Sequence, residues 1–98
     1  MKNTIIAIAA MTSLSLFAIE NQVTVCTQGD AQRKIEIVYP QGEETPCEVQ
    51  YTKASGMQVL WKAEAQLGYC EEKAAAFIEK QRGWGWQCET LSAETTSQ

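Results

Sequence analysis

The chain has 98 residues, of which 45% are hydrophobic, and it carries a net charge of −4. That length allows one domain of ordinary size. The sequence contains no histidine, which excludes histidine-based catalytic triads and histidine metal sites. The acidic balance argues against nucleic acid and against an anionic membrane as partners, because both require a basic patch.

The N-terminal segment has the composition of a secretory signal peptide. Lys2 is followed by an apolar stretch over residues 5–18, with no charge before Glu20. The stretch is shorter and more interrupted by Ser and Thr than a membrane span, which needs about 20 apolar residues. The alternative is a buried N-terminal helix.

These features divide the chain into three parts. We expect residues 1–18 to be a signal peptide, residues 19–90 to form one domain and residues 91–98 to be a flexible polar tail. The mature protein is then exported, to the periplasm or out of the cell, without membrane insertion.

Between residues 21 and 61, apolar and polar residues alternate, and turn residues separate the runs. The alternation predicts about four antiparallel strands that form a meander with one apolar face. The apolar positions are Val23, Val25, Ile35, Ile37, Tyr39, Cys47, Val49, Tyr51, Val59 and Trp61. The polar positions of the other face are Lys34, Glu36, Gln50, Thr52 and Gln58.

The lengths of the turns predict a register for this meander. Pairing across the first turn places Val25 opposite Ile35, and pairing across the second places Ile35 opposite Tyr51. A three-residue third turn places Tyr51 opposite Val59. Each choice keeps the apolar side chains on one face, whereas a slip of one residue would send a strand's apolar set to solvent.

A helix that covers the apolar face is predicted after the meander. Its apolar stripe recurs at spacings of three and four residues: Leu67, Cys70, Ala74, Phe77, Ile78 and Gln81. Gly68 is the expected N-cap and Gly83 the expected C-terminal stop. A short last strand over residues 84–88 completes an α+β fold, in which one helix covers a small antiparallel sheet.

The four cysteines are expected to form two disulfides, because an exported domain of this size needs covalent staples. Zinc is disfavoured because no two of these cysteines form a Cys-x-x-Cys pair. The expected register and helix place Cys47 near Cys70 and Cys26 near Cys88. The runner-up connectivity joins Cys70 to Cys88.

Two tryptophans near the C-terminus are the candidate ligand-binding residues. Trp84 and Trp86 share a parity and are expected to project to the same side of the last strand. They either close the core against Phe77 and Tyr51 or form an exposed aromatic platform.

Acidic side chains offer weak candidates for metal binding or acid–base chemistry. Glu43, Glu44 and Glu48 could gather calcium, but the Asp-rich loop pattern is missing, and a solvated loop is the favoured interpretation. Glu71 and Glu72 are explained by the helix dipole, because they lie in the first turn of the predicted helix.

Hydroxyl and basic side chains do not identify a functional site in the sequence. The serines Ser55, Ser92 and Ser97 have no histidine base. The cations of the predicted second to fourth strands are too sparse in the sequence to identify an anion site. They are Arg33, Lys34, Lys53 and Lys62.

The ordered signature from Cys26 to Cys88 includes the segments 33–39, 46–51 and 68–71 and ends in Gly-Trp-Gly-Trp-Gln-Cys. It resembles a group of short exported proteobacterial proteins of unknown function with four cysteines. The resemblance implies export and two disulfides, and it implies no activity or ligand.

The sequence therefore predicts a small, non-enzymatic binding or structural protein of the cell envelope, without cofactor or metal. Its partner would be a protein or a small ligand. The alternative is a secreted enzyme inhibitor that acts through the loop over residues 41–46. An enzyme is disfavoured, because no nucleophile–base or redox pair can be assembled from the residues present.

Overall fold

The computed structural model describes residues 18–91, which form a five-stranded sheet and one helix. The elements, in chain order, are β1 (Gln22–Gln28), β2 (Ala31–Val38), β3 (Cys47–Lys53), β4 (Gly56–Ala63), α1 (Tyr69–Gly83) and β5 (Gln87–Leu91). The predicted signal peptide, except Ala18, and the tail beyond Leu91 lie outside the described residues.

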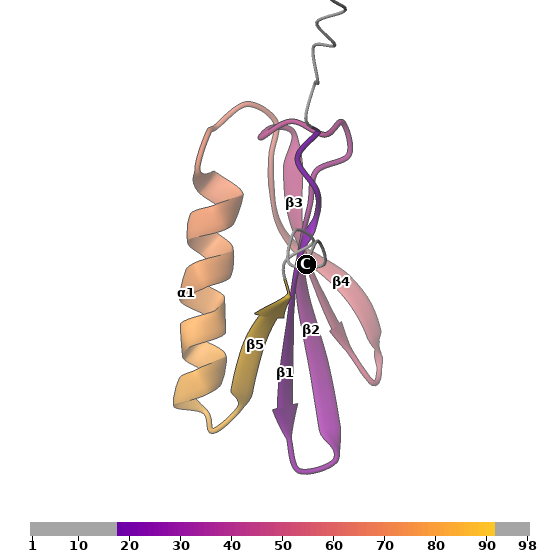
Figure 1. Ribbon diagram of the computed structural model, residues 1–98, viewed down its shortest axis with the longest axis vertical. Helices are drawn as coiled ribbons and strands as arrows, with labels where there is room; N and C mark the ends of the chain where they lie inside the picture. The colour runs from indigo at the N-terminus through magenta and orange to yellow at the C-terminus, as the bar shows by residue number, and fades with distance from the viewer. Residues whose placement is uncertain (1–17, 92–98) are drawn as a thin grey trace, which may run out of the picture.

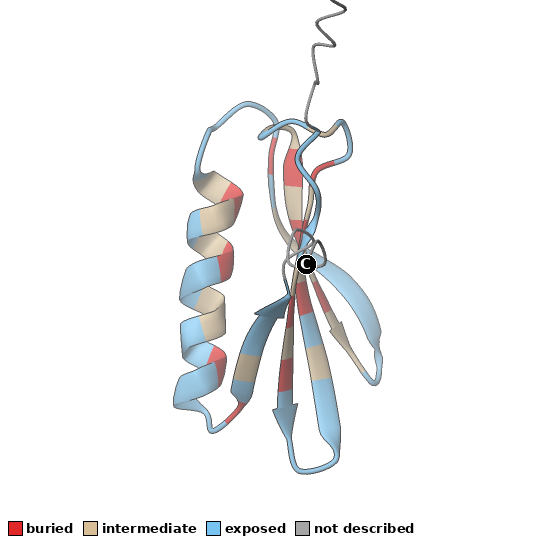
Figure 2. Cartoon of the chain, viewed as in Figure 1, coloured by how far each residue is buried: buried red, intermediate tan, exposed pale blue. Residues whose placement is uncertain are grey.

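The sheet is antiparallel throughout and has the order β4-β3-β2-β1-β5. The helix α1 lies along one side of it, and the β1–β2 and β3–β4 turns lie toward the same end as the C-terminus of α1 (Figure 1). The buried residues of α1 lie on the side that faces the sheet, and its outer side is exposed (Figure 2). The α+β fold expected from the sequence is confirmed.

The register of β1 differs by one residue from the prediction. Ile35 lies opposite Thr24, not Val25. The reason is a two-residue turn: Gln28 pairs with Ala31, and Gly29 has a φ of 60°, which a tight hairpin favours at its first central position.

The inward face of β1 therefore holds polar and sulfur-bearing side chains instead of valines. Thr24 and Cys26 are buried, whereas Val23 and Val25 lie half-buried on the open face. Burial of Thr24 is tolerated because its hydroxyl lies 2.8 Å from that of Thr90 on β5 and hydrogen-bonds with it.

The register between β3 and β4 is correct at one end and shifted at the other. Trp61 lies opposite Val49, as predicted, but Gln58 rather than Val59 lies opposite Tyr51. The turn has two residues instead of three, and an irregularity beside Leu60 restores the register beyond it. Val59 is consequently 40% exposed.

The helix begins as predicted but ends two residues later. Gly68 is the N-cap, with a φ of 80°. Gly83 is the last helical residue, and the left-handed residue that stops the helix is Gly85, with a φ of 95°. The backbone N–H groups of Gly85 and Trp86 donate to the carbonyls of Arg82 and Gln81, the pattern of a Schellman motif.

This helix end alters the predicted last strand. Trp84 and Trp86 belong to the turn, and β5 starts at Gln87. The two tryptophans therefore do not share a face: Trp86 is buried and Trp84 is 57% exposed. Leu91, predicted to open the tail, is the last residue of β5 and pairs with Val23.

The disulfides join Cys26 to Cys88 and Cys47 to Cys70, the connectivity expected from the sequence. The first links paired positions of β1 and β5. The second fastens the start of α1 to the start of β3. All four cysteines are used, so the described residues hold no free thiol.

Gly85 is expected to be essential for the helix end. Alanine at this position would hold a left-handed conformation, which costs about 1–2 kcal/mol, and its Cβ would lie 2.8 Å from the Gln28 amide nitrogen. We predict that Gly85→Ala lowers the free energy of unfolding by at least this amount, measured by denaturant unfolding of the oxidised protein.

Gly83→Ala is the matched control. A Cβ at Gly83 meets nothing within 4 Å, and this glycine does not have a positive φ. Alanine should stabilise the helix there by up to about 1 kcal/mol. Equal effects of the two substitutions would contradict the assignment of Gly85 as the helix stop.

Candidate functional site

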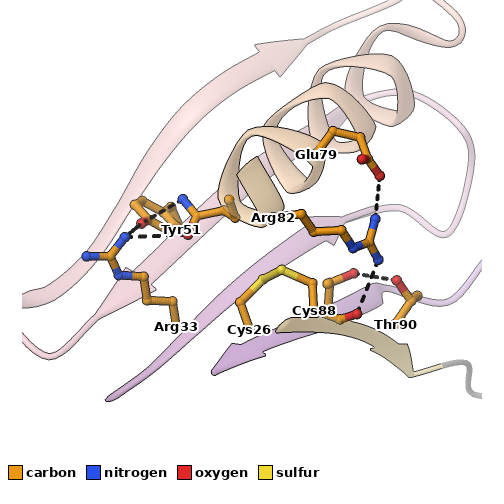
Figure 3. The surroundings of a disulfide bond; sticks show 9 residues. Cys26, Arg33, Tyr51, Glu79, Arg82, Cys88 and Thr90 are labelled. Carbon is orange, nitrogen blue, oxygen red and sulfur yellow. Dashed lines mark hydrogen bonds and ion pairs between the residues drawn. A yellow bond between two sulfur atoms is a disulfide. The ribbon is translucent and has the colours of Figure 1, made fainter. Parts of the chain in front are cut away.

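Arg33 is held in a polar network beneath the last turn of α1 (Figure 3). Its Nη1 donates to the Tyr51 hydroxyl at 2.8 Å and lies 3.4 Å from Gln81 Oε1. The amide of Gln81, which is fully buried, donates to the same hydroxyl at 3.1 Å. The network fixes the guanidinium on the helix side of the sheet.

Trp86 supplies the surface on which this guanidinium rests. The Arg33 Cζ lies 4.2 Å from the centre of the Trp86 ring, which is a cation–π geometry. The backbone N–H of Trp86 donates to the backbone carbonyl of Gln81, whose side chain also contacts Arg33. Gln81 therefore positions both the Trp86 ring and the Arg33 cation. Of the two alternatives that the sequence left open, burial in the core holds for Trp86, and its ring lies against Arg33.

A hollow of about 590 Å³ opens beside Arg33, between the two hairpin turns. We call it the turn hollow. Its lining includes Asp30, Ala31, Arg33, Lys53, Ala54 and Trp86. Ala31, Ala54 and Trp86 give it an apolar wall, and the rest of the lining is polar: two cations, one carboxylate, Gln32 and Ser55.

Lys53 brings a second positive charge to the turn hollow. Lys34 pairs with Thr52, so Arg33 and Lys53 lie one register step further along the same two strands. Like charges on neighbouring strands are destabilising. Among residues 18–91, neither cation forms an ion pair, although Asp30 also lines the hollow.

The sheet separates the four cations that the sequence left unassigned. Arg33 and Lys53 share parity with the buried Ile35 and Tyr51 and line the helix side. Lys34 forms an ion pair with Glu36 on the open face, 3.5 Å away. The structure therefore brings Arg33 and Lys53 together at one hollow, a proximity that their positions in the sequence did not show.

The remaining candidates lie apart from this cluster. Trp84 is exposed outside the hollow's lining, whereas Ser55 lines it. Glu43 and Glu44 are exposed, and Glu48 accepts a hydrogen bond from Gln50. Across the described part of the chain, no three His, Cys, Asp or Glu side chains gather where they could hold a metal. Ser92 and Ser97 lie outside the described residues.

A second polar contact joins the start of α1 to the end of β2. The buried Tyr39 hydroxyl donates to Glu71 Oε2 at 2.6 Å, whereas Glu72 is exposed. Burial, and then the Glu71 carboxylate, raise the pKa of the Tyr39 phenol well above its usual value of 10.0. Glu71 is thus a structural acceptor in the first turn of α1, whereas the turn hollow is lined by residues of the two hairpin turns and by Trp86, which follows the end of α1.

The raised pKa of Tyr39 predicts a loss of stability in alkali. The folded state retains the phenol proton above pH 10.0, where the unfolded chain releases it. The free energy of unfolding should therefore be unaffected by this group below about pH 10 and fall as pH rises further. Denaturant unfolding of the native protein and of Tyr39→Phe across this range tests the effect, and the same alkaline slope in both would contradict it.

Comparisons with protein-family models, with curated proteins and with solved structures find no match. The one helix among the described residues is neither long nor apolar enough to cross a membrane. The candidate site therefore rests on its own geometry.

Proposed function

We propose that this chain is an exported, non-enzymatic binding domain that takes a small organic anion in the turn hollow. The observation that carries the proposal is the pair of Arg33 and Lys53, two cations that share one hollow without a carboxylate in contact. A bound carboxylate or phosphate would relieve their mutual repulsion and accept their hydrogen bonds.

The form of the hollow favours a ligand with an apolar body. Ala31, Ala54 and Trp86 line it, and Trp86 presents a large aromatic surface below the guanidinium. A ligand could place its anionic group between Arg33 and Lys53 and its apolar part against the alanine methyls and the indole. Benzoate is the simplest probe with both parts.

The Arg33 site is also preorganised. Tyr51 and Gln81 hold Nη1 of Arg33. The other two guanidinium nitrogens have no hydrogen-bond partner among the described residues. A side chain already fixed in place loses less conformational entropy on binding. Two disulfides and the predicted signal peptide support export, where such a domain would meet small solutes or envelope components.

Titration of the oxidised protein with benzoate, followed by NMR shifts of the indole and backbone amide groups, tests the proposal. We expect saturable changes at the turn hollow. Arg33→Gln should weaken binding about tenfold or more, since a hydrogen bond to a charged group contributes about 1.5–3 kcal/mol. Lys53→Gln, which leaves the Arg33 network intact, should weaken it by a smaller factor.

Lys34→Gln is the matched control, because it removes one charge from the neighbouring position on the opposite face of β2. It should leave the affinity for benzoate unchanged. Absence of saturation with both benzoate and inorganic phosphate, or equal losses in Lys34→Gln and Lys53→Gln, would refute the proposal.

The inhibitor function remains the second candidate, and the anchoring of the loop over residues 41–46 favours it. The disulfide Cys47–Cys70 and the Tyr39–Glu71 hydrogen bond fix the chain on both sides of that loop. Glu43 and Glu44 are exposed within it. Protection from proteolysis confined to this loop, on addition of a candidate enzyme, would support inhibition over anion binding.

A further inference from the structure

A second hollow lies between α1 and β4, away from the turn hollow. Its volume is about 190 Å³, and Trp61, Lys73, Ala76, Phe77 and Lys80 line it. We call it the edge hollow. It borders β4, the edge strand whose outer side has no neighbouring strand in the described structure.

The floor of the edge hollow is aromatic. The rings of Trp61 and Phe77 meet edge to face, with centroids 5.8 Å apart, and both side chains are only partly buried. Trp61 is present here because the irregularity beside Leu60 keeps it on the helix side of β4. The size and chemistry of the floor suit one apolar side chain from outside.

Two lysines border this floor. The Lys73 ammonium lies 5.9 Å from the centre of the Trp61 ring and 5.5 Å from that of Tyr69. Lys80 is seven residues further along α1, about 10.5 Å away at the helical rise per residue. Within residues 18–91 neither lysine forms an ion pair.

We propose that the edge hollow binds an extended acidic segment of a partner protein. One apolar side chain would enter between Trp61 and Phe77, and acidic side chains two positions before and after it would meet Lys73 and Lys80. Those two acidic residues lie on one side of an extended chain, about 13 Å apart. This separation matches the two lysines within the reach of their side chains.

The charges favour this occupant over a second copy of the chain. Antiparallel pairing of two β4 strands would place the lysines of both copies on one face across the joined edge, where like charges repel. The irregularity at Leu60 also interrupts the edge against a long strand ladder. Side-chain contacts in the hollow would therefore carry recognition.

The test uses the blocked peptide Glu-Ser-Leu-Ser-Glu and the oxidised protein, with affinity measured by NMR titration. We expect saturable shifts at Trp61 and along the exposed side of α1, and weaker binding at high salt. The double variant Lys73→Gln/Lys80→Gln should bind about tenfold more weakly, as expected for the loss of two exposed ion pairs. Replacing the leucine of the peptide by serine should also weaken binding.

Two controls make the result specific. Lys62→Gln removes a charge from β4 opposite Glu48, on the other face of the strand, and should not change the affinity. The charge-reversed variant Lys73→Glu/Lys80→Glu should prefer the peptide Lys-Ser-Leu-Ser-Lys. Arg33→Gln should retain peptide binding even where it loses benzoate, which separates this inference from the function of the turn hollow.

Three results would overturn the inference. The first is no saturable binding of the acidic peptide, and the second is an equal loss of affinity in Lys62→Gln. The third is concentration-dependent self-association that protects Trp61 and Phe77, which would assign the edge hollow to a second copy.

Discussion

The structure depends on how α1 is held against the sheet. Among the described residues it is the only helix, and it covers the apolar face with a short stripe of buried positions, Cys70, Ala74 and Gln81. So small an interface is weak by itself, because a domain of this size buries a modest share of its surface. The disulfide Cys47–Cys70 at the start of α1 and the pair Cys26–Cys88 just beyond its end compensate, at about 2–4 kcal/mol each.

The end of α1 transmits this constraint to the candidate site. Gln81 accepts the Trp86 N–H with its backbone carbonyl, while its side-chain amide contacts Tyr51 and Arg33. A buried amide with defined partners is costly to displace. Gln81 therefore positions both the Trp86 backbone and the Arg33 guanidinium. The geometry of the turn hollow depends in this way on where the helix ends.

Much of the fold could be predicted from the period of the apolar residues. The α+β class, the central β2–β3 register and the start of α1 depend on patterns several residues long, and the structure reproduces them. Two errors came from single-residue choices in turns. Both hairpins close with two residues, as the pairs Gln28–Ala31 and Lys53–Gly56 show. Pattern alone does not distinguish Gly29–Asp30 from a turn one residue longer, because Val23 and Val25 would suit the inner face equally well.

The site was harder to predict because its signals look like ordinary surface charge. Arg33 and Lys53 extend the parity of Ile35 and Tyr51 onto the helix side, and Gln81 interrupts an apolar helical stripe. Both patterns are visible in the sequence, but only if each polar residue is assigned to a face. Trp86 could not be placed at all without knowing that Gly85, rather than Gly83, ends the helix.

The cations at the two hollows lack ion-pair partners among the described residues because of where they lie, not because carboxylates are scarce. The chain has twelve acidic and eight basic side chains, so carboxylates are plentiful. Nevertheless, the ion pairs among the described residues are Lys34–Glu36 and Glu79–Arg82, and none of these four residues lines either hollow. A sheet that needed only solubility on its helix side could place glutamine or serine at these positions without the repulsion between Arg33 and Lys53. Anions bound from outside the chain would offset this repulsion and give the unpaired cations their partners.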